Sequence, residues 1–162
     1  MKKRNGYDNI LKKAVENNNL SQKEIEILLS VKGEQYEKLC NTADRIREEK
    51  VGNKVYLRGI IEFSNYCNQN CRYCGLRKEN KKLKRYKLSP EEIVKMAEDA
   101  YNLGYKTIVL QSGEDQYPAD KISWIIKEIK NKTNDSAITL CLGEREFEEY
   151  KEWFEQGADR YL

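Results

Sequence analysis

Three of the five cysteines in this 162-residue chain lie close together in the sequence. Cys67, Cys71 and Cys74 follow the spacing C-x3-C-x2-C, directly after an apolar run that ends at Phe63. One loop of this length can fold three thiolates around a single metal centre. Tetrahedral zinc sites usually take four protein ligands, and the chain has no histidine to complete a mixed set. A [4Fe–4S] cluster normally takes four cysteines, so three would leave one iron open to a ligand that is not protein.

The aromatic residue before the last cysteine, Tyr73, makes the pattern more specific. With it, the loop resembles the cluster loop of the radical S-adenosylmethionine (SAM) superfamily. The resemblance implies that Cys67, Cys71 and Cys74 hold a [4Fe–4S] cluster whose open iron binds SAM, with Tyr73 beside the cofactors. It also implies an enzyme in which the reduced cluster cleaves SAM to a 5′-deoxyadenosyl radical. The alternative is that the cysteines are isolated thiols or bind structural zinc.

Composition and charge exclude several other classes of function. The chain is long enough to bury a core, and 35% of its residues are charged. The net charge of +3 is too small to argue for a nucleic-acid partner. No apolar run approaches the ~20 residues of a membrane span, and no signal segment opens the chain. We therefore expect a cytoplasmic protein with reduced thiols, and neither a membrane nor a nucleic acid as partner.

The first part of the chain, residues 1–50, has a helical pattern throughout and is expected to form a helical preface. Ser21 begins the pattern S-x-x-E of a capping box. In the helix that follows, Ile25, Leu28 and Leu29 are expected on the inner, apolar face. Cys40 falls on the apolar face of the next helix, where we expect a buried structural thiol.

From residue 51 onward, apolar strands alternate with amphipathic helices. Strands are predicted at residues 55–63, 107–110 and 137–142. This alternation predicts an α/β fold with a parallel sheet, in which the loops after the strands meet at one rim. The superfamily is built on a (βα)6 partial TIM barrel, of which residues 51–162 would form the N-terminal portion. We therefore expect N-terminal helices followed by the first part of such a barrel, in a chain that is truncated from a longer protein.

Five stretches narrow the resemblance to the HydE-type maturation proteins of [FeFe]-hydrogenase. In chain order they are Arg58–Cys67, Cys74–Arg77, Lys84–Glu92, Thr107–Asp115 and Gly157–Leu162. The resemblance implies a role in assembling the diiron active site of [FeFe]-hydrogenase. It also implies a small organometallic or amino-acid-derived substrate, and it implies other hydrogenase maturases and an external electron donor as partners.

The same resemblance implies roles for residues near the ends of the predicted strands. Those that match SAM-contacting positions are Gln111, Ser112 and Glu114. Those that match positions lining the internal cavity, where anionic ligands and the substrate lie, are Arg58, Thr139 and Arg160. Without the resemblance, the two arginines suit ordinary ion pairs and Glu114 suits a surface carboxylate. Cys141 stands where the family has serine, and a thiol is the weaker hydrogen-bond partner.

Other functions stay open on the residues alone. A methylornithine synthase-like or biotin synthase-like radical SAM enzyme would use the same cysteine spacing. A simple electron carrier would need a fourth cysteine near the loop, and none is there. A zinc-dependent RNA-binding module could use the basic residues of segment 76–88, but few aromatic residues are present there to stack on bases.

Overall fold

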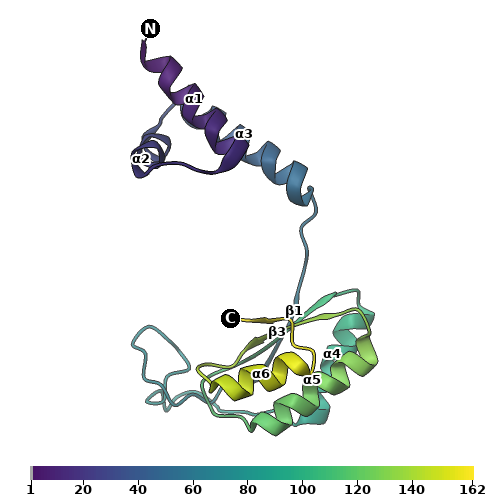
Figure 1. Ribbon diagram of the computed structural model, residues 1–162. Coiled ribbons are helices and arrows are strands. Elements are labelled where there is room, and N and C mark those ends of the chain that lie inside the picture. The colour runs from purple at the N-terminus through teal and green to yellow at the C-terminus, as the bar shows by residue number, and fades with distance from the viewer. Residues whose placement is uncertain (1) are drawn as a thin grey trace. The chain divides into compact units, whose positions relative to one another are not determined.

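The computed structural model describes residues 2–162, and the chain divides into two compact units after Val55. The first unit consists of helices, and the second contains a sheet with helices (Figure 1). Within residues 2–162, no helix combines the length and the apolar character that crossing a membrane requires. Each unit is described below by itself.

The first unit has three helices, α1 (Lys2–Asn17), α2 (Gln22–Ser30) and α3 (Glu34–Val51). Its small core is made by Tyr7, Leu11 and Leu28. The Tyr7 hydroxyl donates a hydrogen bond of 2.6 Å to the carbonyl of Gln35, which ties α1 to α3. The predicted capping box is present at Ser21, whose side chain accepts from the third backbone N–H of α2.

Two expectations about this unit are wrong. Leu28 is buried as expected, but Ile25 and Leu29 are exposed, the latter by 81%, because the small core of this unit takes only Leu28 from α2. Cys40 is also exposed rather than buried. Its neighbour Leu39 packs against the core, and one step along a helix turns the next side chain about 100° away.

The second unit is built on a parallel sheet of four strands in the order β1-β2-β3-β4. The strands are β1 (Gly59–Ser64), β2 (Thr107–Ser112), β3 (Ala137–Cys141) and β4 (Arg160–Tyr161). The helices between them are α4 (Pro90–Asn102), α5 (Ala119–Thr133) and α6 (Phe147–Glu155). All three helices cover the same face of the sheet (Figure 1). This arrangement confirms the predicted α/β fold with the first units of a partial barrel.

The two faces of the sheet differ in what they bury. Side chains that point to the helices form a closed apolar core, which includes Phe63, Ile108, Leu110, Ile138 and Leu140. Side chains on the opposite face are mixed in character. Neighbours there, from β1 to β4, are Ile60, Val109, Thr139 and Arg160, followed one layer nearer the C-terminal ends by Glu62, Gln111 and Cys141. The first strand is shorter than expected, because residues 55–58 are exposed and make no sheet pairing.

Asp159, just before β4, joins three elements at the edge of the sheet. One oxygen, Oδ2, accepts from the Ile138 N–H at 2.7 Å and from the Lys130 ammonium at 2.9 Å. Partial burial raises the pKa of this carboxyl, but the Lys130 and Ile138 donors outweigh burial and hold the pKa below its usual value. The ionised carboxylate is therefore favoured by folding.

Replacing Asp159 with asparagine should lower the free energy of unfolding by up to about 1 kcal/mol at neutral pH, since the side chain is 42% exposed and solvent screens the pair. Because the folded pKa lies below the unfolded value of about 3.9, the contribution is present above about pH 4 and is lost as the pH falls further. Denaturant unfolding of both proteins over a pH series should show the difference shrinking towards pH 3. A difference that does not depend on pH would contradict this account.

Candidate functional site

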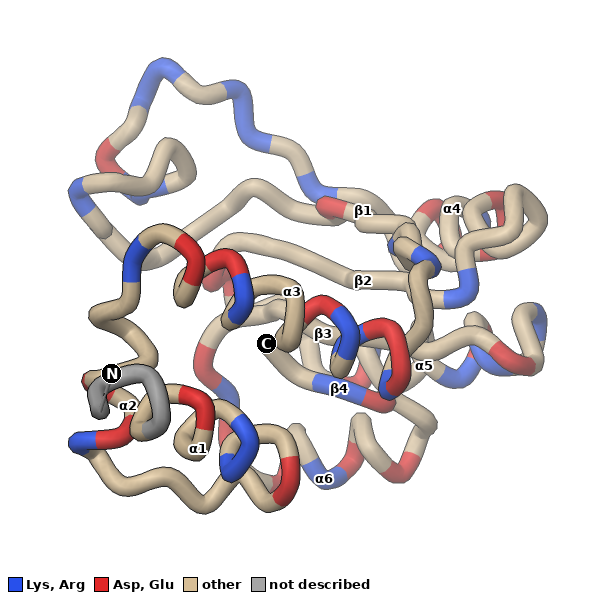
Figure 2. The backbone as a smooth tube through the Cα atoms, turned by 90° about the horizontal axis from the view of Figure 1, so that it is seen from above, with Lys and Arg blue, Asp and Glu red and all other residues tan. Residues whose placement is uncertain are grey.

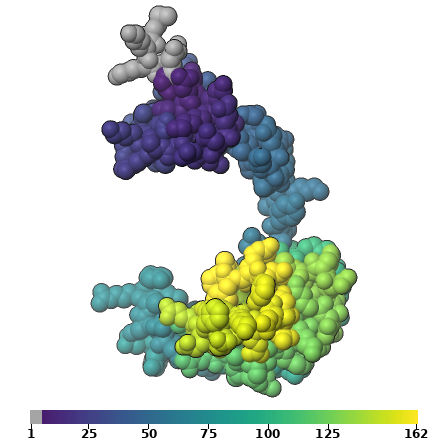
Figure 3. Space-filling view, in the orientation of Figure 1, coloured from purple at the N-terminus to yellow at the C-terminus, as the bar shows by residue number. Residues whose placement is uncertain are grey.

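The three cysteines lie on the connection between β1 and α4, which is irregular and follows the C-terminal end of β1. All three are free thiols; Cys67 and Cys74 are half-buried and Cys71 is exposed. The Cys74 N–H donates to the Cys71 carbonyl at 3.1 Å, which closes a turn around Tyr73. Tyr73 is 94% exposed. Figure 3 shows this connection, in teal, projecting from the second unit.

The base of the connection is held by two polar side chains. The Asn65 amide donates to the Lys84 carbonyl at 2.9 Å and accepts from the Tyr86 N–H at 2.8 Å. The Arg85 guanidinium donates to the carbonyls of Leu76 and Arg77, both at 2.8 Å. Segments on either side of the cysteines are thereby fixed next to each other, although the connection has no regular secondary structure.

Gly113, directly after β2, allows the cysteine connection to lie against the end of that strand. A Cβ atom at residue 113 would stand 2.1 Å from the Tyr66 carbonyl oxygen and 2.9 Å from Cβ of Cys67. The backbones also bond directly, since the Gly113 N–H donates to Ser64 O at 3.1 Å and the Asn68 N–H donates to Glu114 O at 2.8 Å. The Cys67 end of the connection therefore lies against the loop that carries Glu114, in line with the topology, and convergence of Cys71 and Cys74 on the same site stays a prediction.

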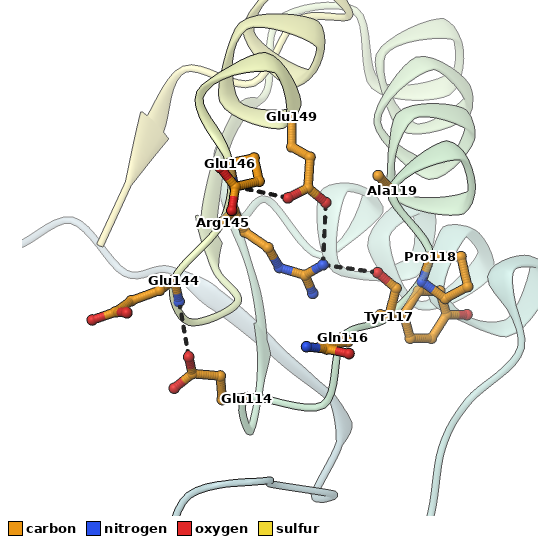
Figure 4. A pocket seen from close by; sticks show the side chains of 9 residues that line it. All are labelled: Glu114, Gln116, Tyr117, Pro118, Ala119, Glu144, Arg145, Glu146 and Glu149. Carbon is orange, nitrogen blue, oxygen red and sulfur yellow. Dashed lines mark hydrogen bonds and ion pairs between the residues drawn. The ribbon is translucent and has the colours of Figure 1, made fainter.

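Glu114 in turn is fixed by the loop after β3. Its Oε1 accepts from the Glu144 N–H at 3.3 Å, as Figure 4 shows. Gly143 has a φ of +80°, and a Cβ atom there would stand 2.5 Å from Cγ of Glu114. The Glu114 side chain therefore occupies the space that any other residue at position 143 would need. The sequence offered only a weak signal for this role, a glycine directly after a predicted strand.

Arg145, which the sequence did not single out, links the loops after β2 and β3. Its side chain is 7% exposed, and Nη1 donates to Tyr117 O at 3.1 Å and to Glu149 at 3.3 Å (Figure 4). Its Nη2 atom is buried and has no hydrogen-bond partner among the described residues. These residues line a cavity of about 570 Å³ that Glu114 and Glu144 border from the other side.

The other residues matched to SAM contacts lie at the end of β2. Gln111 faces Cys141 on the neighbouring strand, with 3.9 Å between the amide nitrogen and the sulfur. The Ser112 hydroxyl donates to the Gly113 carbonyl at 2.6 Å, so its proton is used locally. Gln111 and Cys141 thus share the open face of the sheet, one layer above Thr139.

The three residues matched to the cavity also lie on or beside the open face. Thr139 is fully buried, yet its Oγ1 atom has no hydrogen-bond partner in the described structure. Arg160 is its direct neighbour on β4 and is exposed. Arg58 precedes β1 and is exposed as well. Neither arginine forms an ion pair within residues 2–162, so the ordinary pairing considered for them is not observed.

The three thiols share one connection but are not gathered around one point. Among the described residues, no group of three His, Cys, Asp or Glu side chains is close enough to hold a metal ion. The donor set itself fits an iron–sulfur cluster, because thiolates are soft ligands and the chain offers them without histidine. Metal binding commonly supplies the free energy that draws such ligands together.

The family model of the radical SAM superfamily matches residues 61–162. The matched part begins in β1, includes the three cysteines and runs through the sheet. This chain therefore belongs to the radical SAM superfamily. Membership implies a [4Fe–4S] cluster and SAM as cofactors.

Comparison with individual proteins shows which members of the superfamily this chain resembles. The chain is 58% identical over 127 residues to the [FeFe] hydrogenase maturase subunit HydE of Thermotoga maritima, a match that covers 78% of this chain and 36% of that protein. It is 33% identical over 129 residues to 3-methylornithine synthase of Methanosarcina acetivorans, covering 77% of this chain and 37% of that protein. The crystal structure of HydG, a maturase of the [FeFe]-hydrogenase, superposes with a TM-score of 0.81 at 31% identity, covering 96% of this chain and 36% of that one. The chain thus spans little more than a third of the length of these relatives.

If Cys67, Cys71 and Cys74 are the cluster ligands, replacing any one of them with alanine should remove most of the iron from anaerobically reconstituted protein, because only three thiolates would hold the cluster. Iron and sulfide per chain would be measured together with the visible absorption of the cluster. Cys40→Ala is the matched control and should retain full iron, since Cys40 lies on the first unit. Loss of iron in the Cys40 variant would show that the ligand set is wrong.

Proposed function

We propose that this chain is part of a radical SAM enzyme that helps to assemble the diiron active site of [FeFe]-hydrogenase. The single observation that carries this proposal is the 58% identity to the maturase HydE. The fold shared with HydG, also a maturase, supports it. We further infer that the protein works in the cytoplasm, where thiols such as its five free cysteines stay reduced.

In this proposal Cys67, Cys71 and Cys74 hold the cluster, and Tyr73 presents its exposed ring beside it. Gln111, Ser112 and Glu114 contact SAM. Bound together, the reduced cluster and SAM supply a 5′-deoxyadenosyl radical. The chain's own part is to orient SAM: the Glu144 N–H and the space left by Gly143 fix the Glu114 carboxylate.

The open face of the sheet is proposed to bind the substrate. Thr139 offers a buried hydroxyl without a partner, and Arg160 adds a permanent charge on the neighbouring strand. Arg58 adds a second cation at the start of β1. A guanidinium matches the geometry of small anions such as carboxylates, so a small anionic or organometallic substrate suits this face.

The proposal is tested on the whole protein, purified anaerobically, in an activation assay with the other maturases and unmatured hydrogenase. Addition of SAM should change the electron paramagnetic resonance spectrum of the reduced cluster, and the hydrogenase should become active. Gly143→Ala should weaken SAM binding about tenfold, the loss expected when one charge-assisted contact is displaced.

Gly104→Ala is the matched control for that variant. Gly104 also has a positive φ, +96°, but a Cβ atom there would meet no neighbour within 4 Å. Both variants carry the same kind of backbone strain, and only Gly143→Ala displaces Glu114. Equal SAM affinities in the two variants would remove Glu114 from the SAM site, and an unchanged spectrum with SAM would refute the enzyme class.

A methylornithine synthase-like activity is the second candidate, favoured by the 33% identity to 3-methylornithine synthase. The two candidates differ in product rather than in cofactors. Formation of 3-methylornithine, with no activation of hydrogenase, would select this second candidate.

The cysteine connection also bears on how the cluster receives electrons. Residues 72–87 contain eight Lys and Arg and one Glu, while the rest of the chain has 22 basic and 26 acidic residues. Figure 2 shows these basic positions in blue along the connection between β1 and α4. The exposed cations among them that form no ion pair within residues 2–162 are Arg72, Lys78, Lys81, Lys82 and Lys84. We propose that this surface binds an acidic electron-donor protein.

Changing Lys81, Lys82 and Lys84 together to glutamine should slow cluster reduction by an acidic flavodoxin about tenfold at low salt, because electrostatic steering is lost. Reduction by dithionite, which needs no docking surface, should be unchanged. The matched control replaces Lys121, Lys127 and Lys151, which are exposed on α5 and α6. Equal slowing in both triple variants would show a general charge effect and contradict a specific surface.

A further inference from the structure

We infer that Asp115 is a positioning residue, whose carboxylate clamps both ends of the cysteine connection to the loop after β2. Asp115 follows Glu114 in the chain, and its side chain is only 2% exposed. Its geometry is independent of the reaction, while its consequence for the cluster rests on the function proposed above.

The Asp115 carboxylate accepts two hydrogen bonds and forms one ion pair, with partners from three different segments. Its Oδ2 atom accepts a hydrogen bond from the Ser64 hydroxyl at 2.6 Å and forms an ion pair with the Lys87 ammonium at 3.0 Å. Its Oδ1 atom accepts from the Tyr117 N–H at 3.1 Å, within its own loop. A buried carboxylate is stable only when it is paired and hydrogen-bonded in this way.

The two partner side chains mark the entry and the exit of the cysteine connection. Ser64 is the last residue of β1, and Lys87 forms an antiparallel bridge with it just before α4. The Lys87 ammonium also lies over the rings of Tyr117 and Tyr66, at 5.2 Å and 5.7 Å from their centres. Residues 65–86, which include all three cysteines, therefore form a loop whose two ends both meet at the Asp115 carboxylate.

Only an ionised carboxylate satisfies this arrangement. The Lys87 ammonium beside Oδ2 and the Tyr117 N–H beside Oδ1 cannot accept hydrogen bonds, and a carboxylate is the one small side chain that accepts on both atoms. Asparagine has nearly the same shape, but its NH2 group would face a donor in either orientation. Its neutral oxygen would also leave the Lys87 ammonium without a counter-charge. Asp115→Asn should therefore loosen the connection while the core beneath it, around Phe63, stays packed.

Trypsin reports this loosening directly, because the connection is rich in Lys and Arg and needs no metal to be cleaved. In the metal-free whole protein, Asp115→Asn should raise the rate of cleavage within residues 72–87 about tenfold, the effect of a local opening made about ten times more frequent. In reconstituted protein, the same variant should lose iron to a chelator faster and show a weaker spectral response to SAM. Ser64→Ala and Lys87→Met, which each remove one donor, should show the same changes to a smaller degree.

Two control variants separate this role from ordinary stabilisation. Asp159→Asn removes a carboxylate that also holds a lysine and a backbone N–H, but at the far edge of the sheet. Glu79→Gln removes the one negative charge of segment 72–87. Neither should change cleavage within the connection. If Asp115→Asn raises cleavage equally at all sites, or lowers thermal stability without changing cleavage at 72–87, the positioning role is overturned. A wild-type protein that binds no cluster would refute the proposed function and leave the cleavage test valid.

Discussion

The cysteine connection can lie against the end of β2 only because residue 113 has no side chain. A Cβ atom there would overlap the Tyr66 carbonyl, so any other residue would push the connection away from the sheet. The parallel register of β1 and β2 then brings Glu114 next to Asn68, the residue after Cys67. One strand further along, Gly143 leaves the space that the Glu114 side chain occupies. Two glycines therefore set the spacing of these loops: Gly113 allows close backbone contact, and Gly143 leaves room for the Glu114 side chain.

Much of this could be predicted from the sequence, since period and spacing encode it. Buried parallel strands appear as continuous apolar runs, and the run ending at Phe63 located β1 even though its start was placed too early. The loop after such a strand must lie at the shared rim, so the sequence alone predicted that Cys67 and Glu114 lie close together. In the first unit, periodicity alone overestimated burial. Helical spacing places Cys40 on the apolar face of its helix, but it does not show how far a small core extends along that face.

The residues that sequence reasoning missed act through contacts between distant segments. Asp115, Lys87 and Arg145 each bond across loops, and their positions in the chain carry no periodic signal. In the sequence they are ordinary charges in polar stretches. Only the fold shows that a carboxylate such as Asp115 is buried, and burial is what turns a surface ion pair of small value into a constraint on backbone position.

Charged residues that are paired within the chain fix its loops, whereas polar residues without a partner are free to bind a ligand. Asp115 and Lys87 pair with each other and join two loops at the rim. Arg145 pairs with Glu149 of α6 and bonds across the loops to Tyr117 O, although its Nη2 atom has no partner in the described structure. On the open face of the sheet, by contrast, the Thr139 hydroxyl is buried without a partner and the Arg160 charge is unpaired. An unsatisfied buried hydroxyl costs free energy, and an additional hydrogen-bonding partner would recover it. The open face is therefore a part of this unit with binding capacity left.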